Sequence, residues 1–203
     1  MISVIVWFGN NKLTFQRVNK KYRTFSEPED LLFVELPSIP YVQNFFQDFA
    51  FTCEKLKQFV KKYFSKKIVK ENVLCVVPCD TTANEKKIIC ESFESTFAKN
   101  ITIVTYNGLL VDSIESRMCI SASQRSVTIS YFINATEIDK VHLNIATVSK
   151  EEIIFSIRQI ESKFQLQGTP IFYFNLPPNL KIGTEITDGG LIANIRNILT
   201  NKN

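Results

Sequence analysis

The chain has 203 residues, which is enough for one large domain or two small ones. A net charge of +4, spread along the chain, is too small to indicate a nucleic-acid-binding protein. No stretch approaches the roughly 18 consecutive apolar residues of a membrane span, and the first residues lack the basic start and cleavage site of a signal peptide. We therefore expect a cytoplasmic protein.

The five cysteines also favour a reducing compartment. No CxxC pair occurs and the chain has one histidine, so a zinc site is not expected. The cysteines lie mostly within apolar patterns, and we interpret them as core thiols, with a metal or redox role as the alternative. His142 alternates with apolar neighbours in a strand-like pattern and is expected to point to solvent.

Residues 2–36 predict a β-meander of short strands separated by polar turns. The turn after the first strand is Gly9-Asn10-Asn11. A tight turn at this position is either a simple hairpin or a place where backbone amides cradle a phosphate. Both interpretations remain open.

The next element is a helix that begins after Asp48, its predicted N-cap. Its buried stripe repeats at helical spacing, and lysines occupy the outer face and the C-terminal end, where cations suit the helix dipole. A solvated basic face and a face that contacts acidic lipid are both compatible with this pattern.

The stretch from Val73 to Gly108 predicts a βαβ unit, which implies parallel strands. An apolar run, residues 73–77, ends at Pro78, and Thr82-Ala83-Asn84-Glu85 has capping-box spacing at the start of a helix. A second apolar run, residues 101–104, follows. A strand, a helix and a strand within about 35 residues indicate a layered α/β domain.

Residues 118–147 again predict strands, followed by a helix that opens at Ser149. Further strands are expected over 171–176 and 181–187, and Asp188-Gly189-Gly190 opens a short last helix. The two halves therefore have a similar plan. We predict two domains, residues 1–115 and 116–203.

In the order of these elements the chain resembles the bacterial actin homologue MreB, of the actin/Hsp70/sugar-kinase superfamily. The segments that carry the resemblance are 26–28, 40–63, 77–87, 104–110, 120–147 and 185–191. The resemblance implies an α/β fold of two actin-like, ribonuclease H-like lobes, each a mixed sheet with helices. Family members run well over 300 residues, so the two outer subdomains are expected to be missing here.

The departures from the family concern the nucleotide loops. The family's first metal-side carboxylate would be Trp7 and its second would be Ser121, and the glycine-rich phosphate loop becomes residues 121–126. The degenerate nucleotide-loop positions are Gly9, Asn10, Asn11, Ser123, Gln124, Gly189 and Gly190. Side chains in the phosphate loop would crowd a phosphate that needs to approach the backbone.

Glu85 matches the family's glutamate in the helix that helps place the attacking water, and it is a weak catalytic candidate. Its capping-box role explains it without catalysis. Gly189 and Gly190 precede a helix whose dipole could face an adenosine phosphate, or they form an ordinary turn.

The resemblance and its departures together imply a non-catalytic actin-like scaffold or regulator in a cytoskeletal, cell-shape or membrane-assembly complex. We expect no metal, no cofactor beyond weak ATP binding, and no nucleic acid. The expected partners are proteins, such as an MreB-like filament, with homo-oligomers and peripheral contact with the inner face of the membrane as further options. The alternatives are a compact scaffold subunit of an enzyme or of a pilus or secretion machine, and an active ATP-dependent filament former.

Overall fold

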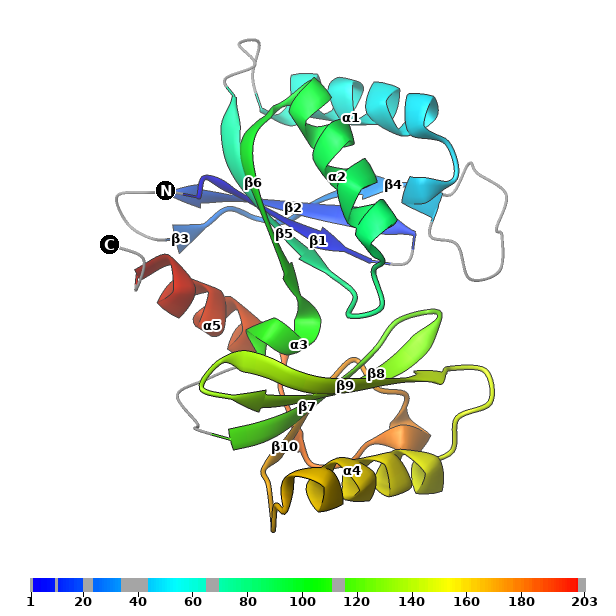
Figure 1. Ribbon diagram of the computed structural model, residues 1–203. Helices are drawn as coiled ribbons and strands as arrows, with labels where there is room; N and C mark the ends of the chain where they lie inside the picture. Colours follow the sequence, from blue (N-terminus) through cyan, green and yellow to red (C-terminus); the bar gives the residue numbers. More distant parts are fainter. Residues whose placement is uncertain are drawn as a thin grey trace. The chain divides into compact units, whose positions relative to one another are not determined.

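The computed structural model describes residues 2–9, 11–19, 24–33, 44–64, 70–110 and 116–200 (Figure 1). The chain splits into two compact units. The first comprises Met1–Val77 and Thr81–Val104, and the second comprises Pro78–Asp80 and Thr105–Asn203. The division of the chain after residue 115, expected from the sequence, differs from these two units and stays a prediction. The tripeptide Pro78–Asp80 thus belongs to the second unit, although the chain on both sides of it belongs to the first.

The first unit is a mixed sheet with the strand order β3-β2-β1-β5-β6, in which β4 also pairs with β2. The central strand β1 runs antiparallel to β2, with Val6 opposite Phe15, and parallel to β5, with Val6 opposite Cys75. The elements are β1 (Val4–Phe8), β2 (Lys12–Asn19), β3 (Thr24–Phe25), β4 (Glu29–Leu32), η1 (Asn44–Phe46), α1 (Phe49–Tyr63), β5 (Glu71–Val77), α2 (Ala83–Thr96) and β6 (Ala98–Thr105).

The two helices of this unit begin where the sequence predicts. The Asp48 carboxylate accepts a hydrogen bond from the Phe51 amide at 2.9 Å and caps α1. At α2 the capping box is complete: the Thr82 amide donates to Glu85 Oε2 at 2.8 Å, and the Glu85 amide donates to Thr82 Oγ1 at 3.2 Å. Both helices pack against one face of the sheet (Figure 1).

Phenylalanine dominates the core between these helices and the sheet. Rings from the strands meet rings from the helices at centroid distances of 4.7 Å for Phe15 and Phe59 and 5.9 Å for Phe8 and Phe93. Aromatic pairs at such distances add to the stabilisation from burial. The buried phenylalanines of this cluster are Phe8, Phe15, Phe33, Phe45, Phe59, Phe64, Phe93 and Phe97.

The second unit is built on a sheet with the strand order β11-β10-β7-β8-β9. Here β7 pairs antiparallel with β8, with Ile120 opposite Ile129, and parallel with β10, with Ile120 opposite Tyr173. The elements are α3 (Tyr106–Leu109), β7 (Ser116–Ala122), β8 (Ser126–Ile133), β9 (Thr136–Asn144), α4 (Lys150–Phe164), β10 (Ile171–Phe174), η2 (Pro178–Leu180), β11 (Thr184–Glu185) and α5 (Asp188–Thr200).

The core of the second unit is mainly aliphatic. Side chains alternate along β7 and β8, so that Ile120 and Ile129 share a face and form one core cluster with Ile153 and Ile157 of α4. Helix α4 lies along one face of this sheet (Figure 1). Ser149 caps α4 by accepting from the Glu152 amide at 3.1 Å, as its sequence predicts. The opposite face of β7 and β8 carries buried polar side chains, among them Arg117, Ser121, Thr128 and Ser130.

The two sheets share one plan and confirm the expected fold class. In each, a central strand has an antiparallel hairpin partner on one side and a parallel strand on the other. Two details differ from expectation. The strand expected over 181–187 shrinks to Thr184–Glu185, and residues 106–109 form the short helix α3. Gly183 has φ +89°, which is far from the extended conformation, so the strand begins only after it.

Of the expected strand over 31–36, residues 31–33 lie in the described part of the chain, and residues 31–32 belong to β4. None of the described helices is long and apolar enough to cross a membrane.

Candidate functional site

The β7–β8 turn, residues 123–125, is closed by the Ser123 side chain. The Ser123 amide donates to the Ser126 carbonyl at 2.9 Å. Ser123 Oγ accepts from the amides of Arg125 and Ser126 at 2.9 and 3.1 Å. Because these two amides take its lone pairs, the hydroxyl hydrogen is directed away from the turn.

That hydroxyl points at the Asp80 carboxylate. Ser123 Oγ donates to Asp80 Oδ2 at 2.6 Å, and Ser126 Oγ donates to the same oxygen at 3.0 Å. The Arg125 guanidinium donates three further hydrogen bonds to Asp80. Nε donates to Oδ2 and Nη2 to Oδ1, both at 3.3 Å, and Nη2 also donates to the backbone carbonyl at 3.0 Å. We call these four residues, Asp80, Ser123, Arg125 and Ser126, the Asp80 cluster.

The Asp80 cluster is largely shielded from solvent. The side chain of Asp80 is 10% exposed and that of Arg125 is 16% exposed. A hydrogen bond to an ionised group is stronger than a neutral one, and an arginine fork that meets both carboxylate oxygens fixes their orientation. The carboxylate is therefore held by three side chains from a turn 43 to 46 residues away in the chain.

A buried polar layer lies next to this cluster on the polar face of the sheet. Cys79 Sγ is 3.2 Å from Ser121 Oγ and accepts from the Asn107 amide at 3.2 Å. The side-chain amide of Asn107 donates to the Cys119 carbonyl at 3.0 Å and to Ser130 Oγ at 2.9 Å. These bonds pair the side-chain N–H groups of Asn107, whereas its buried Oδ1 has no hydrogen-bond partner among the described residues.

Burial raises the pKa of Cys79 to about 11 and that of Cys119 to about 12. Both thiols are therefore protonated at neutral pH, and a protonated thiol is a poor nucleophile. All five cysteines are free, which agrees with the interpretation of the cysteines as thiols. Four are buried, and Cys90 is partly exposed.

His142 extends the polar face at the exposed strand β9. Its Nδ1 is 2.8 Å from Thr128 Oγ1, and the residue is exposed, as its strand pattern predicts. Burial of part of the ring, and then the nearby Lys140 ammonium, lower the pKa of His142. The imidazole is therefore neutral at physiological pH.

The β1–β2 turn of the first unit is the topological counterpart of the β7–β8 turn. The Gly9 amide donates to the Lys12 carbonyl at 2.9 Å, and the Asn11 carbonyl accepts from the Phe33 amide at 2.9 Å. Asn10 lies outside the described residues. Trp7, at the position of the family's first metal-side carboxylate, donates its indole N–H to Gln16 Oε1 at 3.1 Å.

The remaining predicted positions have structural roles in the described chain. Glu85 forms the capping box of α2. Gly189 and Gly190 lie in the first turn of α5, where the Leu191 amide donates to the Thr187 carbonyl at 3.1 Å. Gln124 lies in the β7–β8 turn beside Ser123. Among the predicted site residues that the structure describes, Ser123 belongs to the Asp80 cluster.

Asp80 and Arg125 were not among the predicted site residues. The sequence shows both, Asp80 in a polar turn after β5 and Arg125 in the degenerate phosphate loop. Their pairing depends on the segment 78–80 belonging to the second unit, which no local pattern reveals. The signal that could have found them is the replacement of the family's glycine-rich loop by one with a cation and three hydroxyls.

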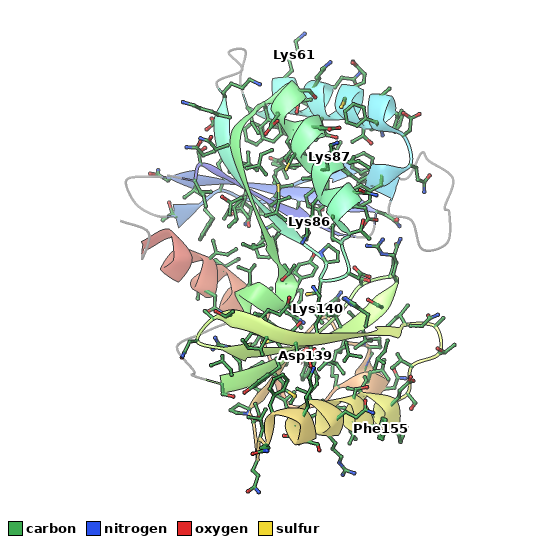
Figure 2. The ribbon with its side chains drawn as sticks, in the orientation of Figure 1. Lys61, Lys86, Lys87, Asp139, Lys140 and Phe155 are labelled. Atoms are coloured by element: carbon green, nitrogen blue, oxygen red, sulfur yellow. The ribbon has the colours of Figure 1, made fainter. Side chains whose placement is uncertain are left out.

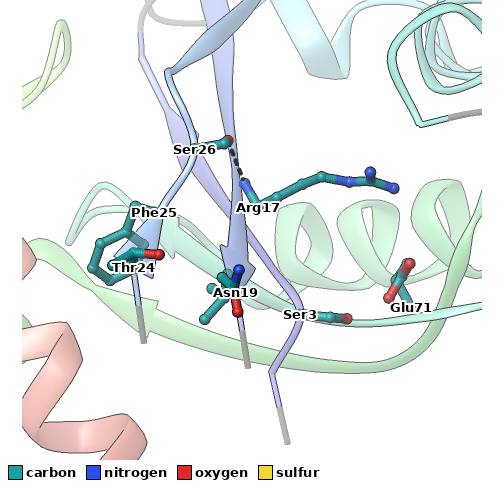
Figure 3. A pocket seen from close by; sticks show the side chains of 8 residues that line it. Ser3, Arg17, Asn19, Thr24, Phe25, Ser26 and Glu71 are labelled. Carbon is teal, nitrogen blue, oxygen red and sulfur yellow. Dashed lines mark hydrogen bonds between the residues drawn. The ribbon is translucent and has the colours of Figure 1, made fainter. Parts of the chain in front are cut away.

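One pocket lies in the first unit, and none of these positions lines it. It measures about 680 Å³ and is lined by Ser3, Arg17, Thr24 and Glu71, among others (Figure 3). The Arg17 amide donates to Ser26 Oγ at 2.9 Å, and its guanidinium stacks 4.7 Å from the centre of the Phe64 ring. None of the predicted site residues lines it.

No protein-family model matches the sequence, and no curated protein matches it. Solved structures do match. A candidate N-acetylglucosamine kinase from Porphyromonas gingivalis is similar over 97% of this chain and 99% of that chain, with a TM-score of 0.61 and 11% identity. A protein of unknown function with an actin-like ATPase fold from Bacteroides thetaiotaomicron is similar over 97% and 95%, with a TM-score of 0.54 and 8% identity.

MreB5 of Spiroplasma citri, solved with bound ADP, also matches, with a TM-score of 0.46 and 12% identity. This chain covers 58% of the length of that protein, and the match takes in 80% of this chain. At these identities the likeness concerns the fold alone. The chain has an actin-like fold, in two compact α/β units.

The actin-like fold implies bound Mg-ATP, and the residues of the β7–β8 turn do not fit it. The side chains that could hold a phosphate here already hold the Asp80 carboxylate. A second anion would repel that carboxylate, because two unit charges about 4 Å apart interact by about 4 kcal/mol at an effective dielectric of about 20. Within the described ranges, no group of three or more His, Cys, Asp or Glu side chains is placed to hold a metal ion.

Proposed function

We propose that this protein is a non-catalytic member of the actin-like fold that acts as a scaffold or regulator through a protein partner. The single observation that supports the loss of catalysis is the Asp80 cluster. In that cluster the hydroxyls of Ser123 and Ser126 and the guanidinium of Arg125 are all directed at a carboxylate of the same chain.

The proposed setting is the cytoplasm, in a cytoskeletal, cell-shape or membrane-assembly complex. The outer face of α1 supports contact with an acidic surface, since it carries exposed lysines, Lys57 and Lys61 among them (Figure 2). Each lysine near an anionic membrane adds about 1 kcal/mol of attraction. A solvated basic face is the alternative.

A second candidate is a compact subunit that supports an enzyme or a pilus or secretion machine. The observation that favours it is size, because the chain matches the Bacteroides thetaiotaomicron protein over 95% of that protein's length. Both candidates require a protein partner and neither requires nucleotide turnover.

Titration calorimetry with Mg-ATP, together with a phosphate-release assay, tests the loss of catalysis. We expect no heat of binding at micromolar nucleotide and no release above the rate in buffer, because the anion site is taken. Glu85→Gln is the matched control. Glutamine also suits this position of a capping box, so the fold should be kept. Micromolar binding, or turnover that disappears in the control, would overturn the proposal.

The partner is tested on protein expressed at its natural level. We expect a stoichiometric complex in light scattering coupled to size-exclusion chromatography, and we expect Lys57→Glu with Lys61→Glu to weaken it if the basic face of α1 is the contact. A chain that stays strictly monomeric and retains no stoichiometric protein through purification would remove the support for a scaffold.

A further inference from the structure

We propose that the β7–β8 turn is an oxyanion-binding site whose occupant is the Asp80 carboxylate of the same chain. This inference rests on the proposed function, since it names the group that keeps the site closed. The class of ligand that the site would take without Asp80 is a small tetrahedral oxyanion, with inorganic phosphate as the simplest member.

The donors of the turn form a site for an oxyanion. Ser123 and Ser126 each direct a hydroxyl to Asp80 Oδ2, at 2.6 and 3.0 Å, and Arg125 contacts both carboxylate oxygens. Hydroxyls and a planar guanidinium suit a carboxylate and a phosphate equally well, because both present two oxygens to the fork. These donors therefore recognise an oxyanion in general, and an aspartate side chain is only one such group.

The geometry of the turn is fixed independently of Asp80. The amides of Arg125 and Ser126 hold Ser123 Oγ, and the Ser123 amide bonds to the Ser126 carbonyl. Because these bonds lie within the turn, removing the carboxylate should leave Ser123 and Ser126 in place. A preorganised set of donors binds an anion without first being ordered.

Asp80 is tethered, and that tether explains why it would exclude a free anion. Its neighbour Cys79 is held by the Asn107 amide and lies beside Ser121, so the segment 78–80 is anchored next to the turn. A tethered group competes at an effective concentration in the millimolar range or higher, whereas free phosphate binds as a separate molecule. The carboxylate therefore acts as an autoinhibitory ligand.

The test uses Asp80→Ala and inorganic phosphate as the probe. We expect about 20 mM phosphate to raise the thermal midpoint of this variant by about 4 °C over an equal ionic strength of potassium chloride, as mass action predicts for millimolar binding. Wild-type protein and the double variant Asp80→Ala with Arg125→Gln should move by less than about 1 °C. Comparison with these two removes the general stabilising effect of phosphate on folded proteins.

Asp80→Asn keeps the shape of the side chain and removes its charge, so it covers the case in which the alanine variant does not fold. If both variants are unfolded without ligand and phosphate does not restore folding, the proposal is wrong. It is equally wrong if the alanine variant folds and responds no more than wild type.

These results are separable from the proposed function. Mg-ATP binding by the wild type would contradict the proposed function, whereas an unresponsive Asp80→Ala would contradict this inference alone.

Discussion

The β1–β2 and β7–β8 turns hold equivalent places in their respective sheets and are closed by the same kind of backbone hydrogen bond, yet the side chains around them make different contacts. In the first, the Gly9 amide meets the Lys12 carbonyl, and the adjacent Trp7 bonds to Gln16. In the second, side chains converge on a carboxylate from a distant segment. A duplicated plan of strands therefore does not bring a duplicated chemistry, because the contacts of each turn depend on its own side chains and on the segment that meets them.

The two cores differ in the same way. The first unit packs eight buried phenylalanines against its sheet, whereas the second packs isoleucines of α4 against isoleucines of β7 and β8. Aromatic and aliphatic side chains thus fill equivalent places in two sheets of one design. The backbone plan fixes where apolar groups must be, and their identity is free as long as the volume is filled.

The largest expected effect tests this difference between the cores. Phe93→Ala removes a fully buried ring whose centroid lies 5.9 Å from that of Phe8 and 5.2 Å from that of Phe97. The substitution should lower the free energy of unfolding by about 3–5 kcal/mol. Ile157→Val in the second unit is the milder counterpart and should cost about 0.5–1.5 kcal/mol. Urea unfolding measures both. A loss from Phe93→Ala no larger than that from Ile157→Val would contradict the tight packing of the Phe93 ring in the first core.

A smaller effect distinguishes the two turns. Arg125→Ala leaves the Asp80 carboxylate with two hydroxyl donors and no cation, and should cost about 2–3 kcal/mol. This is below the cost for a fully buried pair, because both side chains retain some exposure. Gly9→Ala should cost about 1 kcal/mol or less, since a Cβ there would meet Lys12 atoms at 3.3 Å.

Unfolding of both variants in urea at neutral pH gives the comparison, and Arg125→Lys is the matched control. Lysine keeps the charge but cannot make the bidentate contact, so its cost should lie between those of wild type and alanine. If Arg125→Ala lowers the free energy of unfolding by no more than Gly9→Ala does, the Arg125–Asp80 ion pair contributes no more to stability than a solvent-exposed one.

Local patterns were sufficient for the elements of this fold. Asp48, Thr82 and Ser149 are N-caps as predicted, because a cap depends on residues within one helical turn. The order of the elements was enough to expect two α/β halves of similar plan, and the resemblance implied a mixed sheet in each. The short helix α3 was missed, since four residues carry too little periodicity to show a helix.

The candidate site was predicted only in part, and the reason is physical. The loss of glycines at residues 121–126 is visible in the sequence, and Ser123 of that loop contacts Asp80 in the structure. The partner of that loop is Asp80, 45 residues before Arg125, and only tertiary structure brings the two together. A contact at this separation leaves no periodic or spacing signal in a single sequence.

The assignment of Pro78–Asp80 to the second unit has a consequence for dissecting the protein. A cut after Val104 would give a carboxy-terminal fragment that contains Arg125, Ser123 and Ser126 but lacks the carboxylate they hold. Neither half of the chain is therefore a self-sufficient piece. Fragment complementation is the natural way to separate the halves, with the amino-terminal piece supplying the missing aspartate in trans.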